Sequence, residues 1–173
     1  IESEKLSVVK LKELYRQGKE SNIISLAYDV RNGEVIPQIF NKEEDLTFIS
    51  CPGEQVIPNI MEIATTYKDL SYKNFQILAP MYKTYTGIDE INNHLQTIFN
   101  PKENTKKELK IGDVIFREQD KVIQLTNMPD DNVYNGDIGI IDRIVTLPKK
   151  EIHIDFDGNI VKYTPTNFNC FRR

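Results

Sequence analysis

The sequence has few cysteines, glycines and prolines, and it has no long apolar run. Its 173 residues include Cys 2, Gly 8 and Pro 8, with 39% hydrophobic and 28% charged residues. This composition excludes collagen and low-complexity disorder. The apolar runs are a few residues long, against the ~20 residues that a membrane-spanning helix needs. Cys51 and Cys170 form no CxxC pair, which excludes a disulfide framework and predicts a cytoplasmic location.

The chain also lacks an excess of positive charge. Residues 1–105 carry 11 Lys+Arg and 15 Asp+Glu, and residues 106–173 carry 11 of each, which gives the net charge of −4. A strong autonomous nucleic-acid binder has a basic stripe instead, so any DNA contact must use a few placed side chains or belong to a larger surface. The sequence begins at Ile1 without a signal peptide and stops at Arg173 without a structural ending, which predicts a fragment of a longer protein.

The motifs of a complete enzyme are missing as well. The sequence contains no GxxxxGK phosphate loop followed by Ser or Thr, no GxGxxG and no HExxH. His94 and His153 are far apart and have no Cys or carboxylate at metal-ligand spacing, so we expect surface roles for both and no metal site. The acidic run at 43–45 is typical of a solvated loop.

The first part of the chain alternates predicted strands and helices. Strands are expected at 6–9, 48–51 and 74–80, and helices at 21–33, 56–67 and 88–99. Ser21 is the expected N-cap of the first of these helices and Gly33 its left-handed C-terminal residue. Thr86 and Asp89 predict a capping box for the last one. Strands that alternate with helices of about a dozen residues predict a parallel α/β sheet.

After residue 108 the pattern changes to short β runs. Strands are expected at 113–116, 121–125, 138–145, 151–156 and 159–163. Asp157-Gly158 is a hairpin turn signal, and Asn135-Gly136 is a second candidate for a left-handed turn. Several short strands in so small a segment predict a small, strongly bent barrel.

The segment 76–87 is the best candidate for a ligand site on spacing alone. It runs from a predicted buried strand through a loop into a predicted helix. Such loops lie at the ligand-binding edge of parallel α/β sheets, and helix N-termini favour anions. Lys83, Thr84 and the amides near Gly87 are therefore candidates to hold a phosphate. The alternative is an ordinary strand–helix connection with a surface lysine.

Three blocks resemble the second RecA-like domain of RecD/TraA-type superfamily 1 DNA helicases. The first block comprises 14–17, 21–27 and Gly33, and the second comprises 78–83, 87–89, Asn92, Gln96 and 100–101. The third, 120–124 with Asn127 and 133–139, is similar to the SH3-like barrel inserted in that domain. The blocks follow the family's order through nearly the whole chain. The resemblance implies that residues 1–108 are part of a RecA-like domain and that residues 109–173 are the inserted barrel.

The resemblance also implies roles for individual residues. Arg16 matches the arginine that reaches across the interdomain cleft to the γ-phosphate of ATP, and Gln17 flanks it. A guanidinium suits this role because it stays charged and binds phosphate oxygens with two donors. The positions implied for single-stranded DNA are Pro80, Met81, Lys83, Thr84, Asn92, Asn127, Asn135 and Gly136. Their contacts would grip phosphates without reading bases.

Some positions leave alternatives open. A tight turn explains Gly136 and Gly139 as well as a DNA contact does. Two positions depart from the family pattern: Thr84 stands where relatives often have glycine, and Gln119 where a glycine commonly precedes Asp-Lys-Val.

The resemblance implies a fragment of an ATP-dependent helicase that moves 5′ to 3′ on single-stranded DNA. ATP and Mg²⁺ would be bound by the intact parent, whose first RecA-like domain would carry the Walker residues, and neither would be bound by this chain alone. The implied partners are single-stranded DNA, double-stranded/single-stranded junctions and that first domain, with no membrane. The alternatives are a stand-alone protein-binding module, the helicase region of a conjugative relaxase, and the alpha subunit of exonuclease V in DNA repair.

Overall fold

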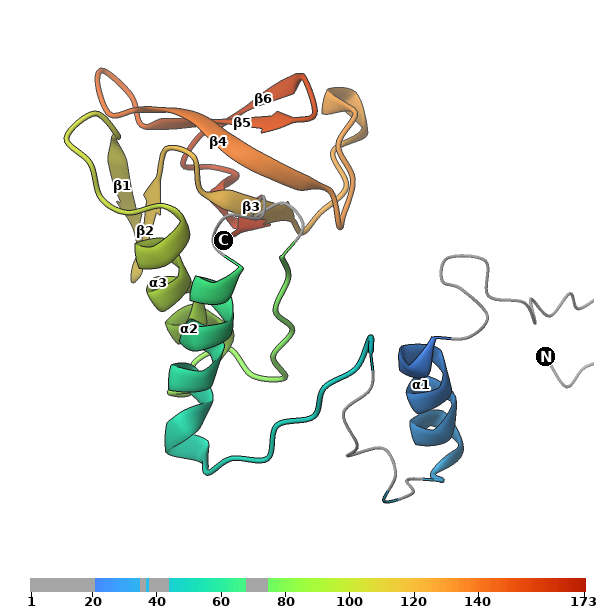
Figure 1. The fold of residues 1–173 in the computed structure, drawn as a ribbon. Helices are drawn as coiled ribbons and strands as arrows, with labels where there is room; N and C mark the ends of the chain where they lie inside the picture. Colours follow the sequence, from blue (N-terminus) through green and yellow to red (C-terminus); the bar gives the residue numbers. More distant parts are fainter. Residues whose placement is uncertain (1–20, 35–36, 38–43, 68–74) are drawn as a thin grey trace, which may run out of the picture. The chain divides into compact units, whose positions relative to one another are not determined.

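A computed structural model describes residues 21–34, 37, 44–67 and 75–173 (Figure 1). The chain divides into two compact units, Ile1–Cys51 and Pro52–Arg173. The predicted strand at 6–9 and the implied ATP-contacting residues Arg16 and Gln17 lie outside the described residues. Within the described ranges, every helix is too short or too polar to cross a lipid bilayer.

The first unit contains the predicted helix, α1 (Asn22–Asn32). Ser21 is its N-cap and Gly33 its C-cap with φ 75°, as the sequence predicts. The capping bond itself comes from elsewhere in the unit, because the Asp45 carboxylate accepts from the Asn22 amide at 3.1 Å and from the Ser21 hydroxyl at 2.7 Å. These hydrogen bonds, first that of Ser21, hold the pKa of Asp45 below its ordinary value.

The second unit begins with a short 3₁₀ turn, η2 (Gly53–Gln55), followed by α2 (Val56–Thr66) and then α3 (Ile88–Phe99). α2 and α3 pack against each other, with Ala64 and Ile91 buried. Both helices lie where the sequence predicts them. The predicted capping box is wrong: the N-cap of α3 is Gly87, and no side chain makes the capping bond.

The expected parallel sheet is not present in the described part of the chain. Residues 48–51 and 75–79, which the apolar pattern predicts as strands, are not strands in the structure. Each strand pair among the described residues is antiparallel. An apolar run gives a segment the composition of a strand, but a strand also needs a hydrogen-bonded neighbour, which composition does not supply.

The rest of the second unit is a curled antiparallel half-barrel. Its strands are β1 (Glu108–Ile111), β2 (Val114–Arg117), β3 (Lys121–Gln124), β4 (Ile138–Val145), β5 (Glu151–Phe156), β6 (Asn159–Tyr163) and β7 (Phe171–Arg172). β1 and β2 form a hairpin, and the other strands form a sheet in the order β6-β5-β4-β3-β7. Figure 1 shows the curled sheet beside the β1–β2 hairpin, with α3 below the hairpin. The five predicted strands are confirmed, whereas β1 and β7 are additional.

The curl of the sheet encloses the apolar core. A register shift in β4 between Ile141 and Arg143 bends that strand, as bulges do. The core side chains are Leu109, Phe116, Val122, Val133, Ile141, Ile144, Ile152, Ile154, Phe156, Val161, Tyr163 and Phe171. The buried hydroxyl of Tyr163 donates to Gln124 Oε1 at 2.7 Å, and burial raises the pKa of this phenol. The predicted hairpin turn at Asp157-Gly158 is confirmed, with φ of 53° and 97°.

Candidate nucleic-acid interface

The loop before α3 presents the first group of residues implied to bind DNA. Pro80, Met81, Lys83 and Thr84 are all exposed. Lys83 makes no ion pair with any described residue, so its ammonium is available to an anion. The loop also borders an open groove of about 430 Å³, whose other walls carry Glu54, Glu90 and His94. Two nearby carboxylates weaken the attraction of this groove for phosphate, so the contact expected from Lys83 is modest.

The N-terminus of α3 does not offer the free amides that the sequence suggests. The backbone amides of Gly87, Ile88 and Asp89 donate to carbonyl oxygens of residues 81–84 at 2.8, 2.9 and 3.2 Å. The loop folds back on the helix and satisfies these donors itself. The expectation that they hold a phosphate is therefore wrong, and the Lys83 and Thr84 side chains remain the candidates in this loop.

The second group lies in the connection from β3 to β4, which includes the 3₁₀ turn η4 (Pro129–Asp131). Asn127 Oδ1 accepts a hydrogen bond from the backbone amide of Asn135 at 2.9 Å. Gly136 has φ 97°, and its amide donates to the Gln124 carbonyl at 2.9 Å. The structure therefore brings the three predicted positions of the barrel together in one exposed turn.

One cavity of about 330 Å³ borders both groups. Leu78 and Tyr82 line it beside the first loop, and Leu125 and Ile138 line it beside the second. The guanidinium of Arg172 lies over the ring of Tyr82, with 4.4 Å between Cζ and the ring centroid. Cation–π contacts of this kind stabilise the position of an aromatic ring. The end of the barrel thus holds the loop that carries Lys83.

α3 faces the barrel with a polar stripe. Asn92, Gln96 and Asn100 follow one another at intervals of four residues, which places them on one side of a helix. Asn92 Nδ2 donates to the carbonyl of Arg173 at 2.7 Å. Gln96 Nε2 and Asn100 Nδ2 donate to the two oxygens of Asp120, each at 2.7 Å. Asn92 therefore has a contact within the chain, and its implied DNA contact stays a prediction.

The buried carboxylate of Asp120 is the acceptor that joins Gln96 and Asn100 to the barrel. The same carboxylate also accepts from the backbone amide of Arg117 at 2.7 Å. Burial raises the pKa of Asp120, because desolvation disfavours the charged form more than the hydrogen bonds favour it. Arg117 extends the network: its guanidinium donates to the Asn100 carbonyl and to Glu108 Oε1. α3 and the β1–β2 hairpin are therefore joined by charged and amide side chains.

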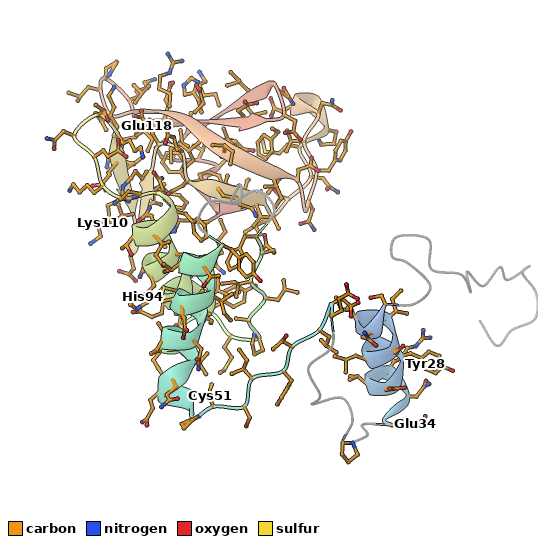
Figure 2. The ribbon with its side chains drawn as sticks, viewed as in Figure 1. Tyr28, Glu34, Cys51, His94, Lys110 and Glu118 are labelled. Carbon is orange, nitrogen blue, oxygen red and sulfur yellow. The ribbon has the colours of Figure 1, made fainter. Side chains whose placement is uncertain are left out.

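Glu118, labelled in Figure 2, closes the barrel beside this network. Its Oε1 accepts from the Ile144 amide at 2.9 Å and its Oε2 from the Lys107 amide at 3.0 Å. One carboxylate thus links β4 to the start of the β1–β2 hairpin. His94, also labelled, lies on the exposed face of α3 and pairs with Glu90 at 3.2 Å. Across the described ranges, His, Cys, Asp and Glu side chains form no group of three or more that could hold a metal ion.

Sequence reasoning missed two of these relationships. Asp120 belongs to one of the recognised blocks, but the pattern assigns it no role. The available signal was the polar stripe of Asn92, Gln96 and Asn100, which needs a hydrogen-bonding partner on whatever it faces. The stacking of Arg172 on Tyr82 joins residues far apart in the sequence, and no local pattern predicts it.

Comparison with known proteins identifies the barrel and its supporting helix. Residues 91–156 match the family described as the ATP-dependent RecD-like DNA helicase SH3 domain. The match begins inside α3 and ends with β5. The chain is also 31% identical over 157 residues, or 90% of its length, to the ATP-dependent RecD2 DNA helicase of Deinococcus radiodurans. It spans only 20% of the length of that curated relative. The chain is therefore related to the RecD-like DNA helicases, and residues 91–156 match their SH3 domain.

Proposed function

We propose that this chain is the part of an ATP-dependent DNA helicase that holds single-stranded DNA during translocation. The observation that carries the proposal is the 31% sequence identity to one such helicase, which extends over 90% of the chain. The intact parent would move 5′ to 3′ in the cytoplasm and would act at junctions between double-stranded and single-stranded DNA. Residues 1–108 would be part of its second RecA-like domain and residues 109–173 the inserted barrel.

The exposed loop and the barrel turn would form the DNA contact. Lys83 would bind phosphates, while Pro80, Met81 and Thr84 would pack against the strand. Asn127 and Asn135 would supply hydrogen bonds from the barrel beside Gly136. Exposure of Lys83 and of both asparagines supports this assignment. Contacts of this kind do not read bases, which suits a motor that crosses any sequence.

ATP turnover would require the first RecA-like domain of the parent together with residues of this chain. Arg16, flanked by Gln17, would contact the γ-phosphate and stabilise the charge that develops during phosphoryl transfer. In the parent, ATP bound with Mg²⁺ would supply the free energy for translocation. The isolated chain would bind neither ATP nor Mg²⁺ and would hydrolyse no ATP.

The test uses the intact parent protein with and without the substitution Arg16→Ala. We expect DNA-stimulated ATP hydrolysis to fall by roughly 10³-fold, the lower end of the effect of arginine fingers. Arg31→Ala is the matched control because Arg31 is exposed on α1, and it should hydrolyse ATP at the parent rate. Unwinding should require a 5′ single-stranded tail. Parent-like hydrolysis by Arg16→Ala would disprove the role of Arg16, and failure of the parent to unwind any tailed duplex would disprove the helicase function.

A protein-binding module is the second candidate, and one observation favours it. Leu78 is 90% exposed beside the apolar cavity, and such a side chain suits a protein partner as well as it suits DNA. This candidate predicts that DNA affinity is no better than nonspecific and does not depend on Lys83. The helicase region of a conjugative relaxase and the exonuclease V alpha subunit share the proposed chemistry. These two alternatives differ from the proposed helicase only in the domains or subunits that would accompany this chain.

A further inference from the structure

A hollow on the barrel is lined by two lysines and by none of the residues implied to bind DNA. Lys110 of β1 and Lys150, which immediately precedes β5, line one open hollow of about 690 Å³. The hollow is completed by Ile111, Pro165, Thr166, Phe168 and Asn169. Phe168 and Asn169 belong to the 3₁₀ turn η5 (Phe168–Cys170), which precedes β7. Figure 2 labels Lys110 at the edge of the barrel.

Three lysines in or beside the barrel have a carboxylate partner, whereas the two lysines of the hollow have none among the described residues. Lys102 pairs with Glu108 at 3.2 Å, Lys106 with Glu103 at 2.8 Å, and Lys162 with Glu151 at 3.8 Å. Lys110 and Lys150 are exposed and form no ion pair with any described residue, and no acidic residue lines the hollow. Two unpaired ammonium groups at one concave surface therefore create a local positive potential on a barrel whose total charge is balanced.

The other lining groups suit an anion that carries an organic chain. Asn169 and Thr166 add an amide and a hydroxyl to the lining, and both groups can donate to an oxygen. The Thr166 hydroxyl also lies 2.8 Å from the Thr164 hydroxyl, and either of the two can be the donor in that hydrogen bond. Phe168 and Ile111 are half-buried and give the hollow an apolar floor. A lysine ammonium binds phosphate as a compact point charge with three donors. A row of phosphates joined by sugars offers both the charge and the apolar surface that these groups would contact.

We propose that this hollow binds the phosphodiester backbone of nucleic acid through Lys110 and Lys150. The inference rests on the proposed DNA helicase function and adds to it a contact site separate from Lys83. The contact is independent of sequence, because the hollow presents charge and an apolar floor rather than a paired set of donors and acceptors for base edges. The backbone can belong to single-stranded or to duplex DNA, and titrations with each form distinguish between them.

The salt dependence of binding counts the phosphates that each surface neutralises. Each contact adds about 0.7 to the slope of log affinity against log salt for a single strand, and about 0.9 for duplex DNA. Replacement of both lysines in Lys110→Ala/Lys150→Ala should therefore lower the slope by about 1.4 on a single strand or about 1.8 on a duplex. The lysines are exposed, so the variant should keep the thermal midpoint of the unmodified chain.

The experiment titrates the 173-residue chain with labelled oligothymidine and, separately, with a labelled duplex at several salt concentrations. The matched control is Lys102→Ala/Lys162→Ala, which removes the same charge from two lysines that have carboxylate partners. Lys110→Arg/Lys150→Arg should retain binding, because it keeps the positive charge. A lower slope in the alanine variant on either ligand, without a change in the control, supports the proposal. The ligand that shows the change identifies the strand form.

Three results would overturn the proposal in distinguishable ways. If Lys110→Ala/Lys150→Ala binds like the unmodified chain while Lys83→Ala binds more weakly, the hollow does not bind DNA and the proposed function is unaffected. If the unmodified chain binds neither ligand at low salt, both the hollow and the DNA-holding role are excluded. A third titration uses polyglutamate, and if Lys110→Ala/Lys150→Ala loses only the binding of this polyanion, the hollow belongs to an acidic protein partner.

Discussion

The carboxylate of Asp120 accepts a hydrogen bond of 2.7 Å from Asn100 Nδ2, which ties the start of β3 to the end of α3. Both residues are buried, with 3% and 6% of their surfaces exposed. The same carboxylate accepts from Gln96 and from the Arg117 amide, so three donors converge on one buried acceptor. Because α3 follows the loop that carries Lys83, this contact also positions that loop relative to the barrel.

Replacement of Asp120 by alanine should strongly destabilise the second unit. The substitution removes the acceptor of one N–H of Asn100, of one N–H of Gln96 and of the Arg117 amide, and each buried donor left unpaired costs about 1–3 kcal/mol. Asn100 Nδ2 keeps its hydrogen bond to the Glu118 carbonyl, and Gln96 Nε2 keeps its hydrogen bond to the Ile115 carbonyl. Partial relaxation should leave a loss of about 2–4 kcal/mol in the free energy of unfolding. Urea unfolding followed by circular dichroism measures it. Asp142→Ala, at an exposed position of β4, should change it by less than about 0.5 kcal/mol, and equal losses in both variants would contradict the account.

The raised pKa of Asp120 predicts how the contribution of this residue to the free energy of unfolding changes with pH. At pH values below 3.8, the ordinary pKa, the carboxyl is protonated in both the folded and the unfolded chain. As the pH rises from there through the raised pKa of the folded state, the unfolded chain ionises first, and stability falls. Other carboxylates, such as Glu108, have lowered pKa values and act in the opposite direction. The comparison must therefore be made against Asp120→Asn, which does not titrate at this position.

The stability difference between the unmodified chain and Asp120→Asn should shrink as the pH rises from acid towards neutrality. Urea unfolding of both proteins at a series of pH values gives this difference directly. A difference that grows with pH would mean that the three hydrogen bonds and the nearby Arg173 outweigh burial, so that the pKa of Asp120 is lowered.

Gln119→Gly should stabilise the barrel. Gln119 lies in the turn between β2 and β3 with φ 74°, a left-handed conformation that is unfavourable for a residue with a Cβ atom. Its backbone amide donates to the Ile141 carbonyl at 2.7 Å, and glycine would keep this bond. We expect a gain of about 0.5–1 kcal/mol in urea unfolding. Gln119→Ala keeps the Cβ atom and should give no gain; an equal gain would show that the glutamine side chain, rather than the backbone, is the cause.

The barrel could be predicted from the sequence because its signals are local. β5 alternates Ile152, Ile154 and Phe156 with polar residues, and Asp157-Gly158 supplies the turn that follows. Position 139 requires glycine because of a close neighbour and not because of a turn, since a Cβ atom there would lie 2.5 Å from Ile154 Cγ2. Such a requirement, and the short strand β7 that exists only because it pairs with β3, arise from tertiary contacts that a local pattern does not contain.

The candidate site was less predictable than the barrel, because its hydrogen bonds also depend on tertiary contacts that a local pattern does not contain. The exposure of Lys83 agrees with the sequence, because a lysine in a polar loop has no strong competing contact. The amides at the start of α3 and the side chain of Asn92 form hydrogen bonds within the chain instead. A sequence shows which groups can bind an anion but does not show which of them the fold has already satisfied.

The most direct test of the central claim is the salt dependence of single-stranded DNA binding by this chain and by Lys83→Ala. We expect weak, salt-sensitive binding of oligothymidine, and a slope of log affinity against log salt that is smaller by about 0.7 in the variant. Lys162→Ala, which removes an exposed lysine outside the candidate interface, should leave the slope unchanged. The same affinity and slope for Lys83→Ala and the unmodified chain would contradict the claim that the loop before α3 holds single-stranded DNA.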